Sequence, residues 1–176
     1  MASGLDFESV VASYYEPLYQ FAFSLTRDEA DACDLTQQTF YIWATKGHQL
    51  RDSSKVKTWL FTTLHRQFLE SRRRQVRFPH QELETVDYEL PVISPAAAER
   101  LDAAQVLGAL SKVDEVYQAP VALFYLEDCA YKEIAEILEI PVGTVKSRIS
   151  RGIGQLQKLL AGPSSTTGQN IVRNQP

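Results

Sequence analysis

Residues 131–160 read YKEIAEILEIPVGTVKSRISRGIGQLQKLL, and the fold of the C-terminal half follows from this segment. It contains two helical patterns, 131–139 and 142–160, which only Ile140 and Pro141 separate. A pair of helices joined by so short a turn is typical of a helix-turn-helix unit. The second pattern has an apolar stripe at steps of three and four residues, which must face the core. The members of the stripe are Val145, Ile149, Ile153, Leu156 and Leu160.

The opposite face of the second helix is polar near its N-terminus, the end that enters the major groove of DNA in such units. Its candidate base-reading residues are Thr144, Ser147, Arg148 and Arg151. An arginine there can bind guanine through two hydrogen bonds, worth about 1–3 kcal/mol of discrimination between bases. We expect Lys146 to contact the phosphate backbone. The alternative is an ordinary surface helix, which explains neither the turn nor the separation of the two faces.

Apolar residues at helical spacing also predict helices upstream of this unit, and no stretch alternates with the period of a strand. The predicted helices cover 96–113 and 117–126, then 6–26, 28–47 and a third N-terminal helix that ends in the arginines 72–74. Pro17 should kink or split the first of them. Ser53 or Ser54 is expected to cap the third. The sequence therefore predicts an all-α fold.

Composition divides the chain into two small helical domains. Acidic residues and prolines mixed with isolated apolar residues predict a flexible linker at 78–95. This linker would join an N-terminal domain, 1–77, to a C-terminal domain with the helix-turn-helix, 96–161. Residues 162–176 are rich in Ser, Thr, Gly and Asn, which predicts a disordered tail.

The charge distribution indicates two DNA-facing surfaces, although the net charge is −4. Positive charge gathers at 55–77 and again at 146–158, and acidic residues gather elsewhere. In the first stretch, Trp59, Phe61, His65 and Phe68 are interleaved with cations, a pattern that suits single-stranded DNA. The competing interpretation is that the aromatic rings at helical spacing belong to the core. Three adjacent arginines on one helix end favour a phosphate partner.

The sequence contains no recognisable motif for catalysis or for metal binding. Cys33 and Cys129 have no pairing motif, and His48, His65 and His80 have no metal-ligand spacing. We therefore expect no catalytic residues, no metal and no cofactor. No apolar run approaches the roughly 20 residues of a membrane span, and the N-terminus has no secretory signal. We expect a cytoplasmic protein without membrane insertion.

Several motifs resemble the extracytoplasmic-function (ECF) group of bacterial RNA polymerase sigma factors. They are DLTQQTF at 34–40 with Trp43, KTWLF at 57–61 followed by His65, Arg66 and the arginine cluster, YQAPV at 117–121, YKEIAE at 131–136 and PVGTVKSR at 141–148. Their order and spacing on one short chain make the resemblance specific. It covers the chain from about residue 7 to residue 160.

The resemblance assigns roles to these motifs. The first is similar to the helix that docks on the polymerase, with Asp34, Gln37, Gln38 and Phe40 as docking residues. The second is similar to the helix that reads and melts the minus-ten element, with Lys57, His65, Arg66, Arg72, Arg73 and Arg74 as DNA-binding residues. The loop at 46–55 would capture a flipped base. The others are similar to the domain that reads the minus-thirty-five element. The implied partners are core RNA polymerase, double-stranded promoter DNA, the melted minus-ten strand and commonly an anti-sigma protein.

The chain departs from the family's pattern at several positions. Gln38 replaces a usual acid, and Gln67 and Glu70 replace the usual Asn and Asp of the melting helix. Glu139 stands where Gly is common, and a left-handed backbone there would cost about 1 kcal/mol. Gly152 and Gly154 each lower helix propensity by roughly 1 kcal/mol, so the far end of the last helix is expected to fray.

The hypothesis that follows is an alternative sigma factor, which binds core RNA polymerase and directs promoter-specific transcription initiation. The alternative is a stand-alone helix-turn-helix regulator whose N-terminal half senses a ligand or dimerises. Residues 55–77 would be superfluous in such a sensor domain. Run-off transcription with core polymerase separates the two, because a repressor cannot start transcripts.

Overall fold

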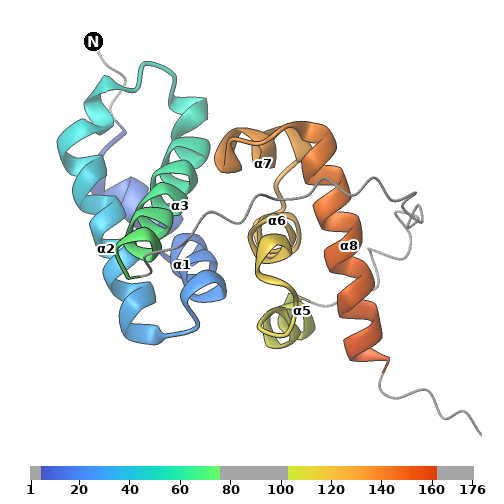
Figure 1. Ribbon diagram of the computed structural model, residues 1–176. Coiled ribbons are helices and arrows are strands. Elements are labelled where there is room, and N and C mark those ends of the chain that lie inside the picture. Colours follow the sequence, from blue (N-terminus) through green and yellow to red (C-terminus); the bar gives the residue numbers. More distant parts are fainter. Residues whose placement is uncertain (1–4, 76–102, 162–176) are drawn as a thin grey trace, which may run out of the picture.

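A computed structural model describes residues 5–75 and 103–161, and its secondary structure in these ranges is helical, without strands (Figure 1). The all-α prediction is confirmed. The N-terminal domain contains α1 (Phe7–Thr26), α2 (Glu29–Lys46) and α3 (Val56–Gln75), with the short 3-10 helices η1 (Gly47–Gln49) and η2 (Ser53–Lys55) between α2 and α3. The C-terminal domain contains α5 (Ala103–Leu110), α6 (Glu115–Tyr125), α7 (Tyr131–Leu138) and α8 (Val142–Leu160). The predicted linker, the start of the predicted helix 96–113 and the predicted tail lie outside the described residues.

α1 supplies one wall of the N-terminal core. Leu18 and Phe21 are fully buried, and the Phe21 ring lies 5.4 Å from the ring of Phe61 on α3, centroid to centroid. Pro17 was predicted to kink or split this helix; α1 continues through it as one helix, so the split is wrong, and the kink stays a prediction. Proline removes the hydrogen bond to the carbonyl of Ser13, but Ser13 is exposed, so water can satisfy that carbonyl.

Local capping fixes where α2 and α3 begin. The Asp28 side chain accepts a hydrogen bond of 2.9 Å from the Asp31 amide, as the acidic start of this helix predicted. Before α3, Asp52 is the N-cap of η2, because its carboxylate accepts from the Ser54 amide at 3.0 Å. Ser53 and Ser54, the two expected caps, lie inside η2, which leads directly into α3.

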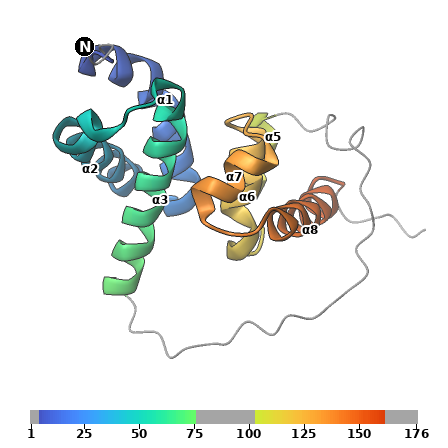
Figure 2. The same ribbon diagram turned by 90° about the horizontal axis from the view of Figure 1, so that it is seen from above.

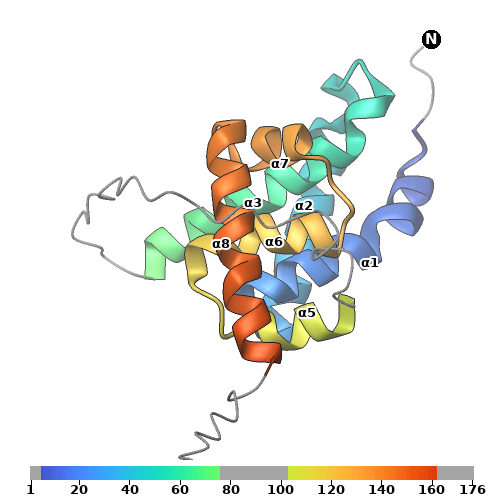
Figure 3. The same cartoon turned by 90° about the vertical axis from the view of Figure 1, so that its right-hand side faces the viewer.

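The C-terminal domain depends on close packing between α6 and α8 (Figure 3). Gly152 on α8 is buried, and a Cβ atom there would lie 2.5 Å from Cγ2 of Val121. Real Cβ atoms do not approach so closely, so the absent side chain allows the two helices to meet. α8 extends to Leu160, and the expected fraying does not shorten it.

The two domains lie against each other. α3 runs beside α7, and α1 beside α6, so the contact joins the last helix of the N-terminal domain to the first helix of the helix-turn-helix (Figure 2). Both candidate DNA-binding elements therefore adjoin the boundary between the domains.

Candidate nucleic-acid interface

The segment α7–α8 forms the predicted helix-turn-helix. Glu133 begins α7 by accepting a hydrogen bond of 2.8 Å from the Ala130 amide. Glu139 closes the helix with φ 56° and ψ 43°, the left-handed conformation that its place in the turn predicted. The Ile140 amide then donates to the Ala135 carbonyl at 3.2 Å. Because Ile134 and Val145 are fully buried, the two helices share one core and hold a fixed angle.

The outer face of α8 keeps most of its candidate DNA-binding residues accessible. Lys146 is exposed, with its ammonium 5.9 Å from the centroid of the Tyr131 ring, and Thr144 and Arg151 are partly exposed. The Ser147 hydroxyl donates to the Thr144 carbonyl at 3.0 Å and keeps lone pairs that can accept. These side chains lie on the side of α8 that faces away from its buried stripe.

The start of α8 suits a phosphate. Its N-cap is Pro141, whose side chain forms no capping hydrogen bond, and a Cβ atom on Gly143 would meet nothing within 4 Å. Free backbone amides and the helix dipole at such an end favour an anion. This open end therefore lies beside the candidate base-reading residues.

Arg148 has a different environment from the rest of that face. It is half-buried and lines a cavity of about 320 Å³ between the domains, together with His65 and Glu115. Burial lowers the pKa of the Arg148 guanidinium below its usual value. Arg148 therefore adjoins residues of both domains.

The cations of α3 are mostly engaged. The Lys57 ammonium donates to the Glu127 carbonyl at 2.8 Å, Arg66 pairs with Glu139, and Arg72 pairs with Glu115. Arg74 pairs with Glu70 one turn earlier at 2.6 Å, and Arg73 is exposed. Burial lowers the pKa of His65 to about 4, so its imidazole is neutral at physiological pH.

The aromatic residues of α3 belong mainly to the core. Phe61 and Phe68 are buried, which favours the core interpretation for both. Trp59 is partly buried, and its ring meets Trp43 edge-on at 5.2 Å between centroids. A stacking platform for bases on Phe61 or Phe68 would therefore require the core to open.

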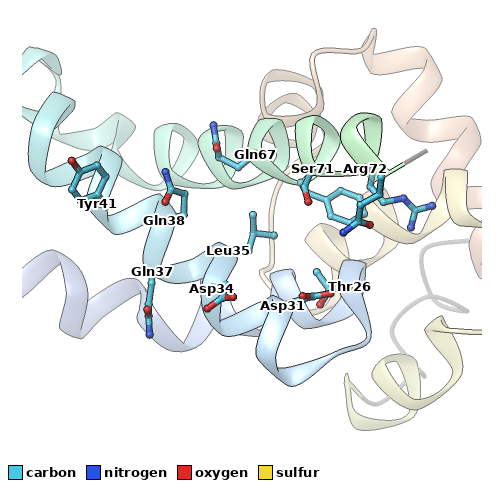
Figure 4. A pocket seen from close by; sticks show the side chains of 12 residues that line it. Thr26, Asp31, Asp34, Leu35, Gln37, Gln38, Tyr41, Gln67, Ser71 and Arg72 are labelled. Carbon is cyan, nitrogen blue, oxygen red and sulfur yellow. The ribbon is translucent and has the colours of Figure 1, made fainter. Parts of the chain in front are cut away.

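The candidate docking residues lie beside a groove between α2 and α3 (Figure 4). Asp34, Gln37 and Gln38 are exposed and line this groove of about 670 Å³. α3 supplies the other wall, with side chains that include Gln67, Ser71 and Arg72. Surfaces that the sequence assigned to polymerase and to DNA thus meet in one groove.

Phe40 differs from the other docking candidates. It is 6% exposed, and its ring stacks on Tyr15 of α1 with 6.2 Å between centroids. Phe40 therefore holds α2 against α1 and leaves the exposed contacts to its polar neighbours.

Comparison with known proteins identifies the family. The model for sigma-70 region 2 matches residues 10–78, and the model for sigma-70 region 4 matches residues 103–156. ECF RNA polymerase sigma factor SigM of Bacillus subtilis is 30% identical, over 86% of this chain and 93% of its own length. The chain belongs to the ECF sigma factors. The ECF sigma factor SigE of Mycolicibacterium smegmatis is 32% identical over 93% of this chain, which spans 65% of the length of SigE.

Two solved structures share the fold of this sigma factor. The sigma factor RpoE of Bartonella quintana, solved with the anti-sigma factor NepR, has a TM-score of 0.69 and 30% identity and covers 90% of this chain and 98% of its own. CnrH, solved with the cytosolic domain of CnrY, has a TM-score of 0.61 and 25% identity over 90% of this chain and 89% of its own. SigM, SigE and RpoE are named as sigma factors, and these names indicate no catalytic activity.

Neither a metal-binding cluster nor a membrane-spanning helix occurs among the described residues. Residues 5–75 and 103–161 contain no group of three or more His, Cys, Asp or Glu side chains able to hold a metal ion. Among the helices of these ranges, none combines the length and apolar character that crossing a membrane requires.

The sequence analysis did not predict the groove between α2 and α3, although the spacing of polar residues on α2 indicates one of its walls. Asp31, Asp34, Gln38 and Tyr41 recur at steps of three, four and three on α2, which places them on one polar face. It also missed Glu127, which is 8% exposed and whose pKa burial raises to about 7, against the opposing effect of Lys57. No local pattern marks Glu127, because its burial depends on how the chain packs around it.

Proposed function

We propose that this sigma factor binds core RNA polymerase and directs promoter-specific transcription initiation, with α7–α8 reading the minus-thirty-five element and α3 reading and melting the minus-ten element. The single observation that carries the proposal is the outer face of α8. Its polar side chains adjoin a helix start without a side-chain cap, so base contacts and a phosphate contact fit the same groove. Thr144, Lys146, Ser147, Arg148 and Arg151 are the proposed contacts.

For the minus-ten element we propose the cationic side of α3. Lys57, Arg66, Arg72, Arg73 and Arg74 would follow the phosphates of the melted strand. His65 lies among them, but its lowered pKa leaves it uncharged, so it would contribute hydrogen bonding rather than charge.

Docking on core polymerase is proposed for α2. Asp34, Gln37 and Gln38 present polar atoms from one face of the helix, and Phe40 fixes that face by packing on α1. An anti-sigma protein is a further proposed partner. The supporting observation is that the structural relative RpoE was solved with the anti-sigma factor NepR.

The proposed division of labour follows the domain limits 1–77 and 96–161, with a linker at 78–95 and a tail at 162–176. The limits of the region 2 and region 4 matches, 78 and 103, support a boundary between them. This role requires no covalent chemistry from the chain, and we propose that it acts in the cytoplasm, where polymerase and promoter meet.

Run-off transcription tests the proposal. Purified chain with core polymerase should yield promoter-specific transcripts, and Arg148→Glu with Arg151→Glu should abolish them. Lys158→Glu is a control for reversing a single charge on this helix, because it reverses an exposed cation in the last turn, away from the N-terminal end. Full activity of the double variant would contradict the assignment of α8, and the absence of any transcript with the unaltered chain would contradict the proposed function itself.

A further inference from the structure

Four cations, one just before α3 and three spread along it, donate to acceptors of the C-terminal domain. The Lys55 ammonium lies 3.2 Å from a carboxylate oxygen of Glu136, and the Lys57 ammonium donates to the Glu127 carbonyl at 2.8 Å. Farther along, the Arg66 Nε donates to Glu139 at 3.2 Å, and Arg72 pairs with Glu115. The contacts extend over most of the length of α3, so they form one surface.

This surface coincides with the one proposed for DNA. Lys57, Arg66 and Arg72 are three of the residues assigned above to phosphates of the melted minus-ten strand. The carboxylates of Glu115 and Glu139 therefore stand where phosphate oxygens would have to lie, and they satisfy the same guanidinium donors. A cation held by a carboxylate cannot bind a phosphate through the same donors.

The contact between the domains also restricts a proposed DNA-binding residue of the C-terminal domain. Arg148, a proposed base-reading residue of α8, lines the cavity between the domains beside His65 and Phe68 of α3. Arg148 is half-buried there, whereas Lys146, two residues earlier, is exposed. One contact thus restricts both proposed DNA-binding helices.

We propose that this arrangement is a closed state that excludes DNA, in which the acidic side of the C-terminal domain occupies the phosphate sites of α3. Promoter binding then requires the two domains to separate. The inference rests on the proposed DNA-binding role of α3, and it adds an intramolecular competitor for that role.

The contact between the two domains is weak enough to open. The side chains of the three ion pairs are between 38% and 62% exposed, so water and salt weaken each pair. The interface also leaves a cavity of about 320 Å³, so the apolar surfaces around it are incompletely packed. A partner that binds the separated domains better than the closed pair, such as polymerase with promoter DNA, will shift the population toward the open state.

Zero-length cross-linking tests closure directly. A carbodiimide joins the Lys55 ammonium and the Glu136 carboxylate as an amide with loss of water, and their separation of 3.2 Å suits this reaction. Mass spectrometry of the full chain should find this cross-link in the free protein and lose it in holoenzyme bound to promoter DNA. Absence of the cross-link in the free protein, or its persistence at full yield in initiating holoenzyme, would overturn the proposal.

A second experiment tests whether the closed state excludes DNA from α3. It measures the affinity of the chain for a fluorescent single-stranded oligodeoxynucleotide of mixed sequence. The triple variant Glu115→Gln, Glu136→Gln, Glu139→Gln removes the competing carboxylates and none of the proposed DNA contacts. The matched control, Glu8→Gln, Glu16→Gln, Glu29→Gln, removes equal charge from exposed positions on α1 and α2, and Glu29 begins α2 as Glu115 begins α6. The interface variant should bind about fivefold more tightly than the control variant.

Equal affinity of the two triple variants for the oligodeoxynucleotide would overturn the closed state.

A separate variant, Arg73→Gln with Arg74→Gln, tests the proposed function alone, because neither arginine contacts the C-terminal domain in the described residues. Loss of affinity in this variant together with equal triple variants would leave the proposed function standing without the closed state. Unchanged affinity in this variant would instead contradict the role of these two arginines in the DNA-binding surface of α3.

Discussion

Arg66 on α3 is paired with Glu139, the residue whose positive φ closes the turn between α7 and α8. Hydrogen bonding to Arg66 lowers the pKa of the Glu139 carboxyl, so the pair stays ionised at physiological pH. One residue therefore serves two purposes, because its backbone shapes the helix-turn-helix and its side chain holds the other domain. Substitutions at this position can separate the two contributions.

Glu139→Gly should stabilise the chain, whereas Glu139→Gln should destabilise it slightly. Glycine relieves a left-handed conformation that costs other residues about 1 kcal/mol, and the exposed ion pair contributes less than that. Glutamine keeps the strained backbone and loses only the charge. Urea unfolding measures both variants, and a lower stability for Glu139→Gly than for Glu139→Gln would contradict this reasoning.

Gly152→Ala should destabilise the C-terminal domain by about 1–3 kcal/mol, because the new methyl group would overlap Val121 on α6. Gly154→Ala is the matched control on the same helix. A Cβ atom at Gly154 would meet nothing within 4 Å, so alanine should stabilise α8 by about 0.5–1 kcal/mol through helix propensity. Thermal unfolding followed by circular dichroism should show shifts of opposite sign, and two shifts of the same sign would argue against the close contact.

These glycines also show what the sequence could and could not reveal. Helix positions were predictable because apolar periodicity is a local property, and the left-handed backbone at Glu139 was indicated by the resemblance, in which Gly is common at that position. Gly152 and Gly154 look alike in sequence, and only the position of α6 makes one a packing requirement. Phe40 was named as a docking residue together with its polar neighbours, because its motif does not reveal that Tyr15 lies against it. The ion pairs between α3 and the C-terminal domain join residues more than 40 positions apart and leave no local pattern.

Stability should depend on pH through two buried groups that act in opposite directions. The pKa of His65 falls from 6.5 to about 4 on folding, so the unfolded chain binds more protons between these values and stability rises with pH there. The pKa of Glu127 rises from 4.5 to about 7, so the folded chain binds more protons and stability falls as pH rises through that window. Between about pH 4.5 and 6.5 the two effects should largely cancel in the unaltered chain.

Single variants should expose each effect. In Glu127→Gln, His65 acts alone, and the free energy of unfolding should rise by about 2 kcal/mol from pH 4 to pH 6.5. In His65→Gln, Glu127 acts alone, and the free energy of unfolding should fall by about 2 kcal/mol from pH 4.5 to pH 7. Urea titrations across this range provide the measurement, and parallel pH profiles for the two variants would refute the assignment.

Gln38→Glu should strengthen binding to core polymerase if α2 is the docking helix. The family's usual acid at this position would add a second carboxylate one turn from Asp34, on the exposed wall of the groove between α2 and α3. A peripheral charge of this kind should tighten binding by about two- to fivefold at low salt and lose that gain as salt rises. Asp34→Asn should weaken binding by a similar factor.

Gln75→Glu is the control, because it adds the same charge to the same groove from the last residue of α3. Fluorescence anisotropy of labelled chain with core polymerase separates the outcomes: equal gains for Gln38→Glu and Gln75→Glu would mean that the polymerase responds to the net charge of the groove, and the docking role of the α2 face would then have to be abandoned.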